Sequence, residues 1–166
     1  MKSYLIKKDQ NGNKIIQKPI NNESVSWESV FPFYNSVTSI GAHGLKSAFY
    51  ICKGWTGSIS FPSLTSIGIS GLSWAFRGCT GLTSVSFPSL TSISGDGLYY
   101  TFYSCTGLTG SISFPNLTDI GESGLYCAFY GCTGLKEVHF KSSLSSNSQC
   151  TASYMGCSGV TIYFDL

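Results

Sequence analysis

A segment that recurs along the chain constrains the fold more than any other feature. Residues 81–93 read GLTSVSFPSLTSI, and near-copies occupy 54–67 (GWTGSISFPSLTSI) and 107–120 (GLTGSISFPNLTDI). Aligned positions recur every 26 or 27 residues. A fixed period of this length predicts a solenoid, because a propeller blade needs about 40 residues or more.

Other residue types recur with the same period and predict the lining of the solenoid. They are the phenylalanines Phe61, Phe87, Phe114 and Phe140; the isoleucines Ile40, Ile67, Ile93 and Ile120; the leucines Leu45, Leu72, Leu98 and Leu125; the aromatic residues Phe49, Phe76, Phe102, Phe129 and Tyr154; and the cysteines Cys52, Cys79, Cys105, Cys132 and Cys157. One unit cannot cover its own apolar edge, so stability must come mostly from stacked neighbours.

Local patterns predict how one unit turns. Val85 and Phe87 lie two residues apart, so they share one face of a strand. Pro88 ends that strand because it has no N–H to donate. Leu72 and Phe76 are spaced i and i+4, which suits a short helical turn. We therefore expect a repeat solenoid of about five rungs, made mainly of short β-strands with short helical turns.

Two rungs are one residue longer within the strand than the segment 82–85. The additional residues are Gly57 and Gly110. An extra glycine inside a strand predicts a β-bulge.

Residues 1–30 lack the repeat, so we expect an N-terminal segment over 1–30 and the solenoid over 31–166. Strand-like residues 4–6 and 14–16 flank Asn11-Gly12, which favours a hairpin with a two-residue turn. Residues 19–24 are typical of a linker. A hairpin would cap the open edge of the first rung, as solenoids require. The alternative is a segment that docks to a larger assembly.

Charged residues are few, and the basic ones gather near the start. Only 11% of residues are charged, the net charge is +2, and five of the ten basic residues fall within the first eighteen. The repeats lack the clustered Lys and Arg that nucleic acids require, so we expect no nucleic-acid partner. No apolar run approaches the roughly 20 residues of a membrane span. The sequence also opens without the apolar segment of a signal peptide.

The repeats resemble the BspA-like, or treponemal-type, leucine-rich repeats. The shared pattern is Leu-x-x-Val-x-Phe-Pro, then Leu-x-x-Ile-Gly, then Ala-Phe-x-x-Cys-x-x-Leu, and 128–135 (AFYGCTGL) is its clearest copy. The resemblance covers roughly 37–164, with Gly-Leu inserted before the Ala-Phe pair. It implies a right-handed leucine-rich-repeat coil. It also implies a bacterial cell-surface or extracellular protein that adheres to host or neighbouring-cell components.

Seven cysteines raise the question of disulfides or a metal. Five share one repeat column, which favours a stack of buried thiols, because rungs about 5 Å apart with parallel side chains make a relaxed disulfide awkward. Cys127 and Cys150 lie outside that column, and a disulfide between them is conceivable. A zinc site from Cys127, Cys132, Cys150 and Cys157 is disfavoured, because tetrahedral ligation has no reason to follow the repeat. We expect no metal and no cofactor.

No convincing catalytic group emerges. His43, Ser70 and Asp96 share a repeat column, but a triad needs the histidine between the other two. Ser70 would lie in the middle, with His43 and Asp96 about 10 Å apart. Glu137 and His139 share one strand face, most simply as an exposed polar pair. The sequence therefore predicts no enzyme.

Aromatic residues beside the phenylalanine column are the strongest candidate binding residues. They are Trp74, Tyr99, Tyr100, Tyr103, Tyr126 and Tyr130, together with Arg77. Some must point outward, because a short turn cannot bury every side. Exposed aromatic rows are typical of surfaces that bind protein or sugar. The alternative is ring-on-ring packing along the stack without any ligand.

Serines on the outer face of the strands are the second candidate. Ser58, Ser60, Ser84, Ser86, Ser111 and Ser113 would form a flat hydroxyl face that ends at Glu137 and His139. In leucine-rich repeats this sheet commonly receives partners. Its lack of large or charged anchors predicts weak binding at most.

These features together predict a non-enzymatic adhesion or interaction module. Its expected partner is a protein or carbohydrate on a host or neighbouring cell. The alternative function is a structural component of a larger assembly, such as a phage or surface particle, docked through the N-terminal segment.

Overall fold

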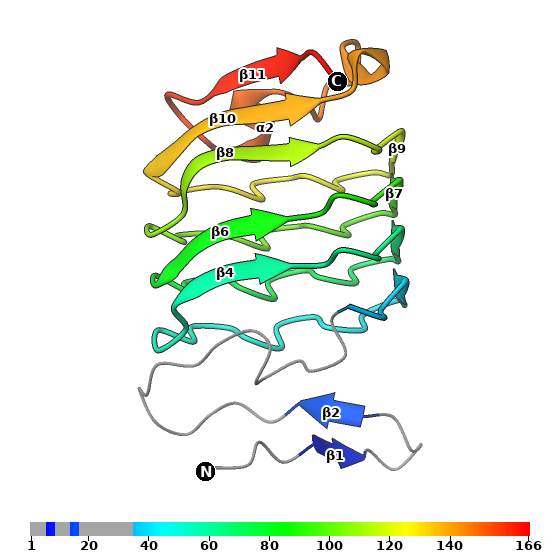
Figure 1. Ribbon diagram of the computed structural model, residues 1–166, viewed down its shortest axis with the longest axis vertical. Helices are drawn as coiled ribbons and strands as arrows, with labels where there is room; N and C mark the ends of the chain where they lie inside the picture. Colours follow the sequence, from blue (N-terminus) through cyan, green and yellow to red (C-terminus); the bar gives the residue numbers. More distant parts are fainter. Residues whose placement is uncertain (1–5, 9–13, 17–34) are drawn as a thin grey trace.

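The computed structural model describes residues 6–8, 14–16 and 35–166. Residues 35–166 wind into a stack of similar rungs, each lying on the one before (Figure 1). This β-solenoid of about five turns confirms the architecture predicted from the repeat.

Five strands follow one another along one side of the stack (Figure 1). They are β4 (Gly57–Ser60), β6 (Leu82–Ser86), β8 (Thr109–Phe114), β10 (Gly134–Phe140) and β11 (Thr161–Phe164). β4 pairs with β6, while β8, β10 and β11 form a three-stranded sheet, and all these pairings are parallel. Parallel pairing follows from the coil, because each strand recurs one full turn of the chain later.

The pairing is irregular beside both extra glycines, but the bulged residue is not the glycine that the sequence predicted. Gly57 and Ser58 of β4 lie opposite Leu82 and Ser84 of β6, so Thr83 is the unpaired residue. Gly110 and Ser111 of β8 lie opposite Leu135 and Glu137 of β10, so Lys136 is the unpaired residue. Gly57 and Gly110 have φ values of 92° and 75°. Glycine adopts such values without steric cost.

A second parallel sheet runs along the neighbouring side of the stack. It consists of β3 (Ser39–Ile40), β5 (Ser66–Ile67), β7 (Ser92–Ile93) and β9 (Asp119–Ile120). The isoleucines stand in register and face the interior. Threonines just before these strands add bonds between rungs. The Thr65 hydroxyl donates to the Thr38 carbonyl and the Thr91 hydroxyl donates to the Thr65 carbonyl, both at 2.9 Å.

The third side consists of overlapping β-turns in place of the helical turn that the spacing of Leu72 and Phe76 predicted. The N–H groups of Leu72, Trp74 and Phe76 donate to carbonyls of the next rung at 2.9 to 3.0 Å. The N–H groups between them, those of Ser73 and Ala75, donate three residues back within their own rung. An α-helix would keep all of these bonds within one rung. The observed pattern instead ties each rung to its neighbour.

Positive φ values recur at every fourth residue along this turn side. The non-glycine examples are His43, Ser47, Ile51, Ser70, Trp74, Asp96, Tyr100, Ser104, Ser123 and Cys127, with φ between 47° and 60°. Such values are uncommon for residues that carry a Cβ, and they cost of order 1–3 kcal/mol each. Nearly all of these residues donate their N–H to the next rung, as Ile51 does to Arg77 at 2.7 Å. The bonds between rungs therefore hold the strained conformation.

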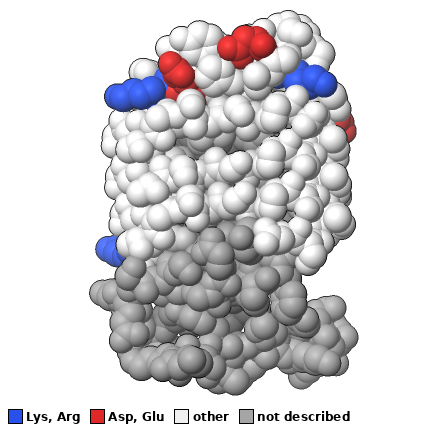
Figure 2. Space-filling view, viewed as in Figure 1, with Lys and Arg blue, Asp and Glu red and all other residues white. Residues whose placement is uncertain are grey.

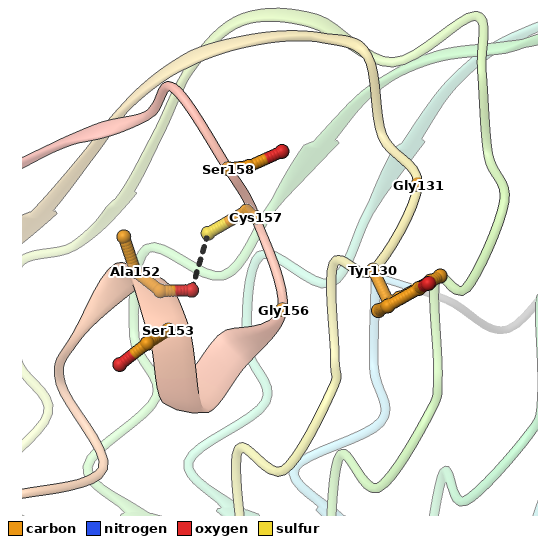
Figure 3. A pocket seen from close by; sticks show the side chains of 7 residues that line it. All are labelled: Tyr130, Gly131, Ala152, Ser153, Gly156, Cys157 and Ser158. Atoms are coloured by element: carbon orange, nitrogen blue, oxygen red, sulfur yellow. Dashed lines mark hydrogen bonds between the residues drawn. The ribbon is translucent and has the colours of Figure 1, made fainter.

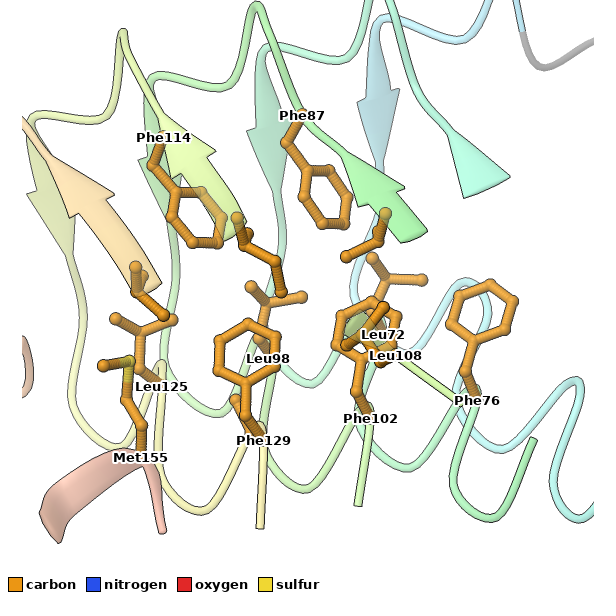
Figure 4. Packing of buried hydrophobic residues seen from close by; sticks show 14 of the residues in the cluster. Leu72, Phe76, Phe87, Leu98, Phe102, Leu108, Phe114, Leu125, Phe129 and Met155 are labelled. Carbon is orange, nitrogen blue, oxygen red and sulfur yellow. The ribbon is translucent and has the colours of Figure 1, made fainter. Parts of the chain in front are cut away.

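Two ladders of stacked phenylalanine rings fill the interior (Figure 4). One contains Phe49, Phe76, Phe102 and Phe129, with neighbouring centroids 5.0 to 5.6 Å apart. The other contains Phe61, Phe87, Phe114 and Phe140, with centroids 5.4 to 5.9 Å apart. All of these rings are buried. The predicted phenylalanine, isoleucine, leucine and cysteine columns therefore line the core, although Leu45 and Cys52 are only partly buried.

The last rung departs from the prediction that Tyr154 lies in the interior. Met155 is fully buried at the end of the phenylalanine row, and Tyr154 is half-exposed (Figure 4). The cause is α2 (Ala152–Met155), a single α-helical turn that replaces the β-turns and changes which side chain faces inward. Thr151 caps this helix, because its hydroxyl accepts the Tyr154 N–H at 3.2 Å.

A glutamine side chain closes part of the same end. The Gln149 side-chain oxygen accepts the Leu125 N–H at 3.2 Å, and its amide group donates to the Gly121 carbonyl at 2.7 Å. The first bond occupies an N–H that another rung would otherwise satisfy, as Gly124 does for that of Leu98. The short 3₁₀ helix η1 (Ser142–Leu144) precedes Gln149 and buries Leu144.

Near the N-terminus, β1 (Ile6–Lys8) and β2 (Lys14–Ile16) pair antiparallel, with Ile6 opposite Ile16. This pairing agrees with the predicted hairpin. The Asn11-Gly12 turn and the linker over 19–24 lie outside the described residues. The division at residue 30 and the capping role of the hairpin therefore stay predictions.

No disulfide joins any of the seven cysteines, including Cys127 and Cys150. Three buried column thiols donate to a phenylalanine carbonyl of the previous rung: Cys79 to Phe49, Cys105 to Phe76 and Cys132 to Phe102, at 3.0 to 3.1 Å. Burial raises the pKa of Cys132 to about 12 and that of Cys157 to about 11. The prediction of a buried thiol stack is confirmed.

Glycine at the entrance to β8 permits a close approach between rungs. A Cβ at Gly107 would lie 2.4 Å from the Thr80 carbonyl oxygen and 2.9 Å from that of Leu82. We expect Gly107→Ala to lower the free energy of unfolding, measured by guanidinium denaturation, by at least about 2 kcal/mol. Gly95→Ala is the matched control, because its Cβ would meet only the Glu122 carbonyl at 3.5 Å. An equal loss at Gly95 would contradict this packing argument.

Backbone strain on the turn side predicts an unusual response to glycine. Ile51 is 47% exposed with a φ of 56°, whereas Ile69 is 58% exposed and has no positive φ. Glycine relieves the strain only at Ile51, while at Ile69 it costs about 0.5–1 kcal/mol of stability. We therefore expect Ile51→Gly to preserve or raise the melting temperature and Ile69→Gly to lower it. Equal losses in both variants would show that Ile51 is not strained.

Thiol burial predicts slow chemical modification of the native protein. With a pKa of about 12, Cys132 is ionised more than about 10³-fold less at pH 8 than an ordinary thiol of pKa about 8.5. We expect the half-buried Cys52 and Cys127 to react first with a disulfide reagent and Cys132 to react only after unfolding. Site-resolved mass spectrometry would measure this order. If Cys132 were labelled in the native protein as fast as in the unfolded protein, this expected order would be wrong.

Candidate binding surface

Aromatic side chains form one connected surface on the turn side of the stack. We call it the aromatic surface, and its members are Tyr50, Trp74, Arg77, Tyr99, Tyr100, Tyr103, Tyr126, Tyr130 and Tyr154. All seven residues predicted from the sequence as binding residues belong to it. The structure adds Tyr50 and Tyr154, which join through Arg77 and Tyr126 respectively.

Rings from successive rungs stack in rows across this surface. The stacked pairs are Trp74 with Tyr100 at 4.6 Å, Tyr103 with Tyr130 at 4.8 Å and Tyr99 with Tyr126 at 5.5 Å between centroids. Their interplanar angles are 7°, 8° and 18°. Edge-to-face contact between Tyr99 and Tyr100 at 4.6 Å joins two of the rows. Ring-on-ring packing along the stack, which was one of the two predicted alternatives, is therefore observed.

Arg77 takes the place of a tyrosine in one row. Its guanidinium carbon lies 4.8 Å from the centroid of the Tyr103 ring, 4.9 Å from that of Trp74 and 5.2 Å from that of Tyr50. Its Nη1 also donates a hydrogen bond to the Tyr50 hydroxyl. A planar guanidinium can stack on ring faces as a further ring would, and its charge is attracted to the π electrons.

The same rings also reach solvent. Tyr130 is 48% exposed and Tyr126 is 38% exposed, and the other members of the aromatic surface are half-buried. The rings therefore both stack on one another and are accessible to solvent, and a binding role for them stays a prediction. The rows pack against each other, and each ring is at least partly accessible to solvent.

Two tyrosine hydroxyls of this surface, those of Tyr99 and Tyr100, have a raised pKa. A hydrogen bond with Cys127, together with burial, raises the pKa of Tyr100 above its usual value. Burial, with smaller contributions from Tyr126 and Asp96, raises the pKa of Tyr99. At neutral pH these groups can therefore donate hydrogen bonds to a ligand.

A hollow of about 500 Å³ borders the aromatic surface at its C-terminal end. Tyr130 and Gly131 line one side, Ala152 and Ser153 of α2 line the other, and the segment 156–158 lies between them (Figure 3). The lining contains no charged side chain. The Cys157 thiol donates to the Ala152 carbonyl at 3.6 Å, so it is already engaged.

The outer face of the strands carries the predicted serine rows. Ser58 and Ser60 of β4 stand beside Ser84 and Ser86 of β6, and on β8 and β10 the register places Ser111 beside Glu137 and Ser113 beside His139. Charged side chains gather toward the end of this face near β10 and β11, and its centre over β4, β6 and β8 shows none (Figure 2). The face offers hydroxyls but no large apolar or charged anchor.

His139 lies in a small polar cluster at the end of this face. Its Nδ1 is 3.0 Å from Asp165 Oδ1, its Nε2 is 3.3 Å from Glu137 Oε2, and its ring stacks on Tyr163 at 4.8 Å. The hydrogen bond to Asp165, aided by that to Glu137, raises the pKa of His139 despite partial burial. The cluster therefore stabilises the fold fully below the usual histidine pKa of about 6.5. This stabilisation is lost as pH rises through the higher folded value.

The other candidates do not assemble into a site. His43 is exposed, Ser70 is buried and Asp96 is half-buried, and no hydrogen bond joins their side chains. Ser70 is thus almost fully shielded from solvent. Within the part of the chain that the structure describes, no group of three His, Cys, Asp or Glu side chains could hold a metal ion.

The sequence analysis did not predict the hollow, and it did not predict that Tyr154 belongs to the aromatic surface. The repeat placed Tyr154 in the interior because it follows the phenylalanine column. The sequence signal that could have revealed the change is Thr151, a preferred N-cap residue just before Ala152, with Gly156 just past the helix end. Those two residues predict a true helix there and hence a different inward face.

Comparison with solved structures supports the fold. A leucine rich cell surface protein from Faecalibacterium prausnitzii A2-165 matches 99% of this chain with a TM-score of 0.58 and 24% identity. The leucine-rich-repeat protein of T. pallidum matches 99% of this chain with a TM-score of 0.51 and 18% identity. This chain covers 40% of the first structure and 80% of the second. At these identities the likeness concerns the fold alone.

No curated protein matches the sequence significantly. In the described part of the chain, no helix combines the length and apolarity needed to cross a membrane.

A family model described as a BspA type leucine rich repeat region (6 copies) matches residues 98–164. These residues carry the same columns as the earlier rungs, which begin before the matched range. The match confirms the resemblance found in the sequence for residues 98–164.

Proposed function

We propose that this chain is a non-enzymatic module that binds a protein on a host or neighbouring cell through its aromatic surface. Leucine-rich repeats of this type suggest a protein-interaction module. The observation that carries the proposal is the composition of the aromatic surface, where tyrosines, one tryptophan and one arginine touch one another on one side of the stack.

Tryptophan, tyrosine and arginine are the residues that contribute most often to protein–protein binding energy. In the aromatic surface the rings are already held by their neighbours, as Tyr103 is held between Arg77 and Tyr130. A partner would therefore order few side chains on binding, and this lowers the entropic cost of association. The serine face offers no comparable anchors, so we assign it no binding role.

A surface location is supported by the name of one structural relative. The F. prausnitzii protein is a leucine rich cell surface protein, and this chain covers 40% of it. The absence of a joined triad at His43, Ser70 and Asp96 supports a binding role over catalysis. Leucine-rich-repeat proteins of this family are generally non-enzymatic.

An array of extracellular-matrix and bacterial surface proteins tests the proposal. We expect binding to at least one arrayed protein and a loss of at least tenfold in affinity, about 1.4 kcal/mol, in Tyr103→Ser and in Arg77→Ala. Since most members of the aromatic surface are neutral, we also expect only weak dependence on salt. Surface plasmon resonance would measure both.

The matched controls are Ser86→Ala and Ser113→Ala on the opposite, serine face. These variants should bind as the unaltered chain does. Binding that survives both aromatic-surface variants but disappears with the serine variants would place the site on the strands instead. Binding to no arrayed protein would count against the proposed function itself.

A further inference from the structure

We propose that the hollow beside Tyr130 binds a neutral sugar ring of a cell-surface glycan. This inference rests on the proposed function, since it assigns a ligand class to one end of the aromatic surface.

The row of planar groups ends at Tyr130, because the next position in the row is a glycine. Arg77, Tyr103 and Tyr130 follow one another along the stack, and the Tyr103 and Tyr130 centroids are 4.8 Å apart. Gly156 comes next, so close that a Cβ there would lie 2.9 Å from Tyr130 Cδ2. Because Gly156 carries no side chain, no further ring continues the row. Tyr130 is left 48% exposed at the border of the hollow.

Hydroxyl and backbone groups make up the polar part of the hollow. Ser153 and Ser158 are both exposed and line it. The Ser158 hydroxyl makes no hydrogen bond within the described residues, and the Ser153 hydroxyl has only a long contact of 3.5 Å with Thr151. Both can therefore donate to and accept from a ligand. Figure 3 shows Ser153 across the hollow from Tyr130 and Ser158 on the segment between the two sides.

A sugar ring combines the two features that these walls complement. Its C–H face can pack against the tyrosine ring, and its hydroxyls can pair with the serines. An anionic ligand would find no cation among the lining residues. An aromatic side chain of a partner protein could cover Tyr130 but would leave the serine hydroxyls without partners, which is unfavourable once water is excluded.

The size of the hollow suits one or two sugar rings. Its volume of about 500 Å³ falls within the range of roughly 300–1,000 Å³ typical of small-molecule sites. The hollow lies at the surface and offers few polar contacts, so we expect dissociation constants in the millimolar range, about 1–10 mM.

Amide NMR spectra of the full chain, titrated with maltose, cellobiose, lactose and chitobiose to about 20 mM each, test the proposal. We expect at least one disaccharide to shift the amides of Gly131, Gly156 and Ser158 in a saturable way. Tyr130→Ala should weaken this binding at least tenfold, and Tyr130→Phe should retain it. Tyr163→Ala, an exposed ring on β11, is the matched control and should leave it unchanged.

Two results would overturn the inference: no saturable shift with any of the four sugars, or a shift that Tyr130→Ala leaves intact. A tryptophan peptide that shifts these amides when no sugar does would also overturn it, in favour of a protein side chain. Should Tyr130→Ala fail to fold, Ser158→Val provides the same test from the polar part of the hollow. Loss of protein binding in Arg77→Ala without any sugar binding would reject only this inference and leave the proposed function standing.

Discussion

Hydrogen bonds between rungs are the interaction on which the rest of this structure depends. On the strand sides they are ordinary parallel ladders. On the turn side every second N–H leaves its own rung, as that of Phe76 does for the Thr101 carbonyl at 3.0 Å. Side chains add further bonds, from the Thr65 hydroxyl and from the Cys105 thiol. No rung can satisfy its backbone alone, so the rungs must form together.

This sharing of bonds explains both the backbone strain and the aromatic surface. Residues such as Trp74 and Tyr100 hold positive φ values because their N–H groups are directed to the next rung. Rungs that share backbone bonds lie about 4.8 Å apart, which is also close to the distance at which aromatic rings stack. A planar side chain repeated in one column is therefore brought into contact with its successor, as Trp74 is with Tyr100 at 4.6 Å.

The predictions succeeded where the repeat itself carried the information. The solenoid, the phenylalanine ladders and the buried thiols of Cys79, Cys105 and Cys132 all follow from column position. The predictions failed where one local sequence pattern is compatible with two backbone conformations. The i, i+4 spacing of Leu72 and Phe76 fits a helix as well as a chain of turns, and only the bonds available from the next rung favour the turns.

The sequence by itself determined the period, the coil and which columns line the core, because each depends on residue types repeated at fixed intervals. Only the tertiary structure decided how the end of the stack is built. There α2 places Met155 in the interior and Tyr154 at the surface. The Gln149 side chain bonds to Leu125. Gly156 has no side chain, so no ring follows Tyr130 in its row. These features occur once in the chain, so no repetition could reveal them. They depend on contacts between residues that only the folded stack brings together.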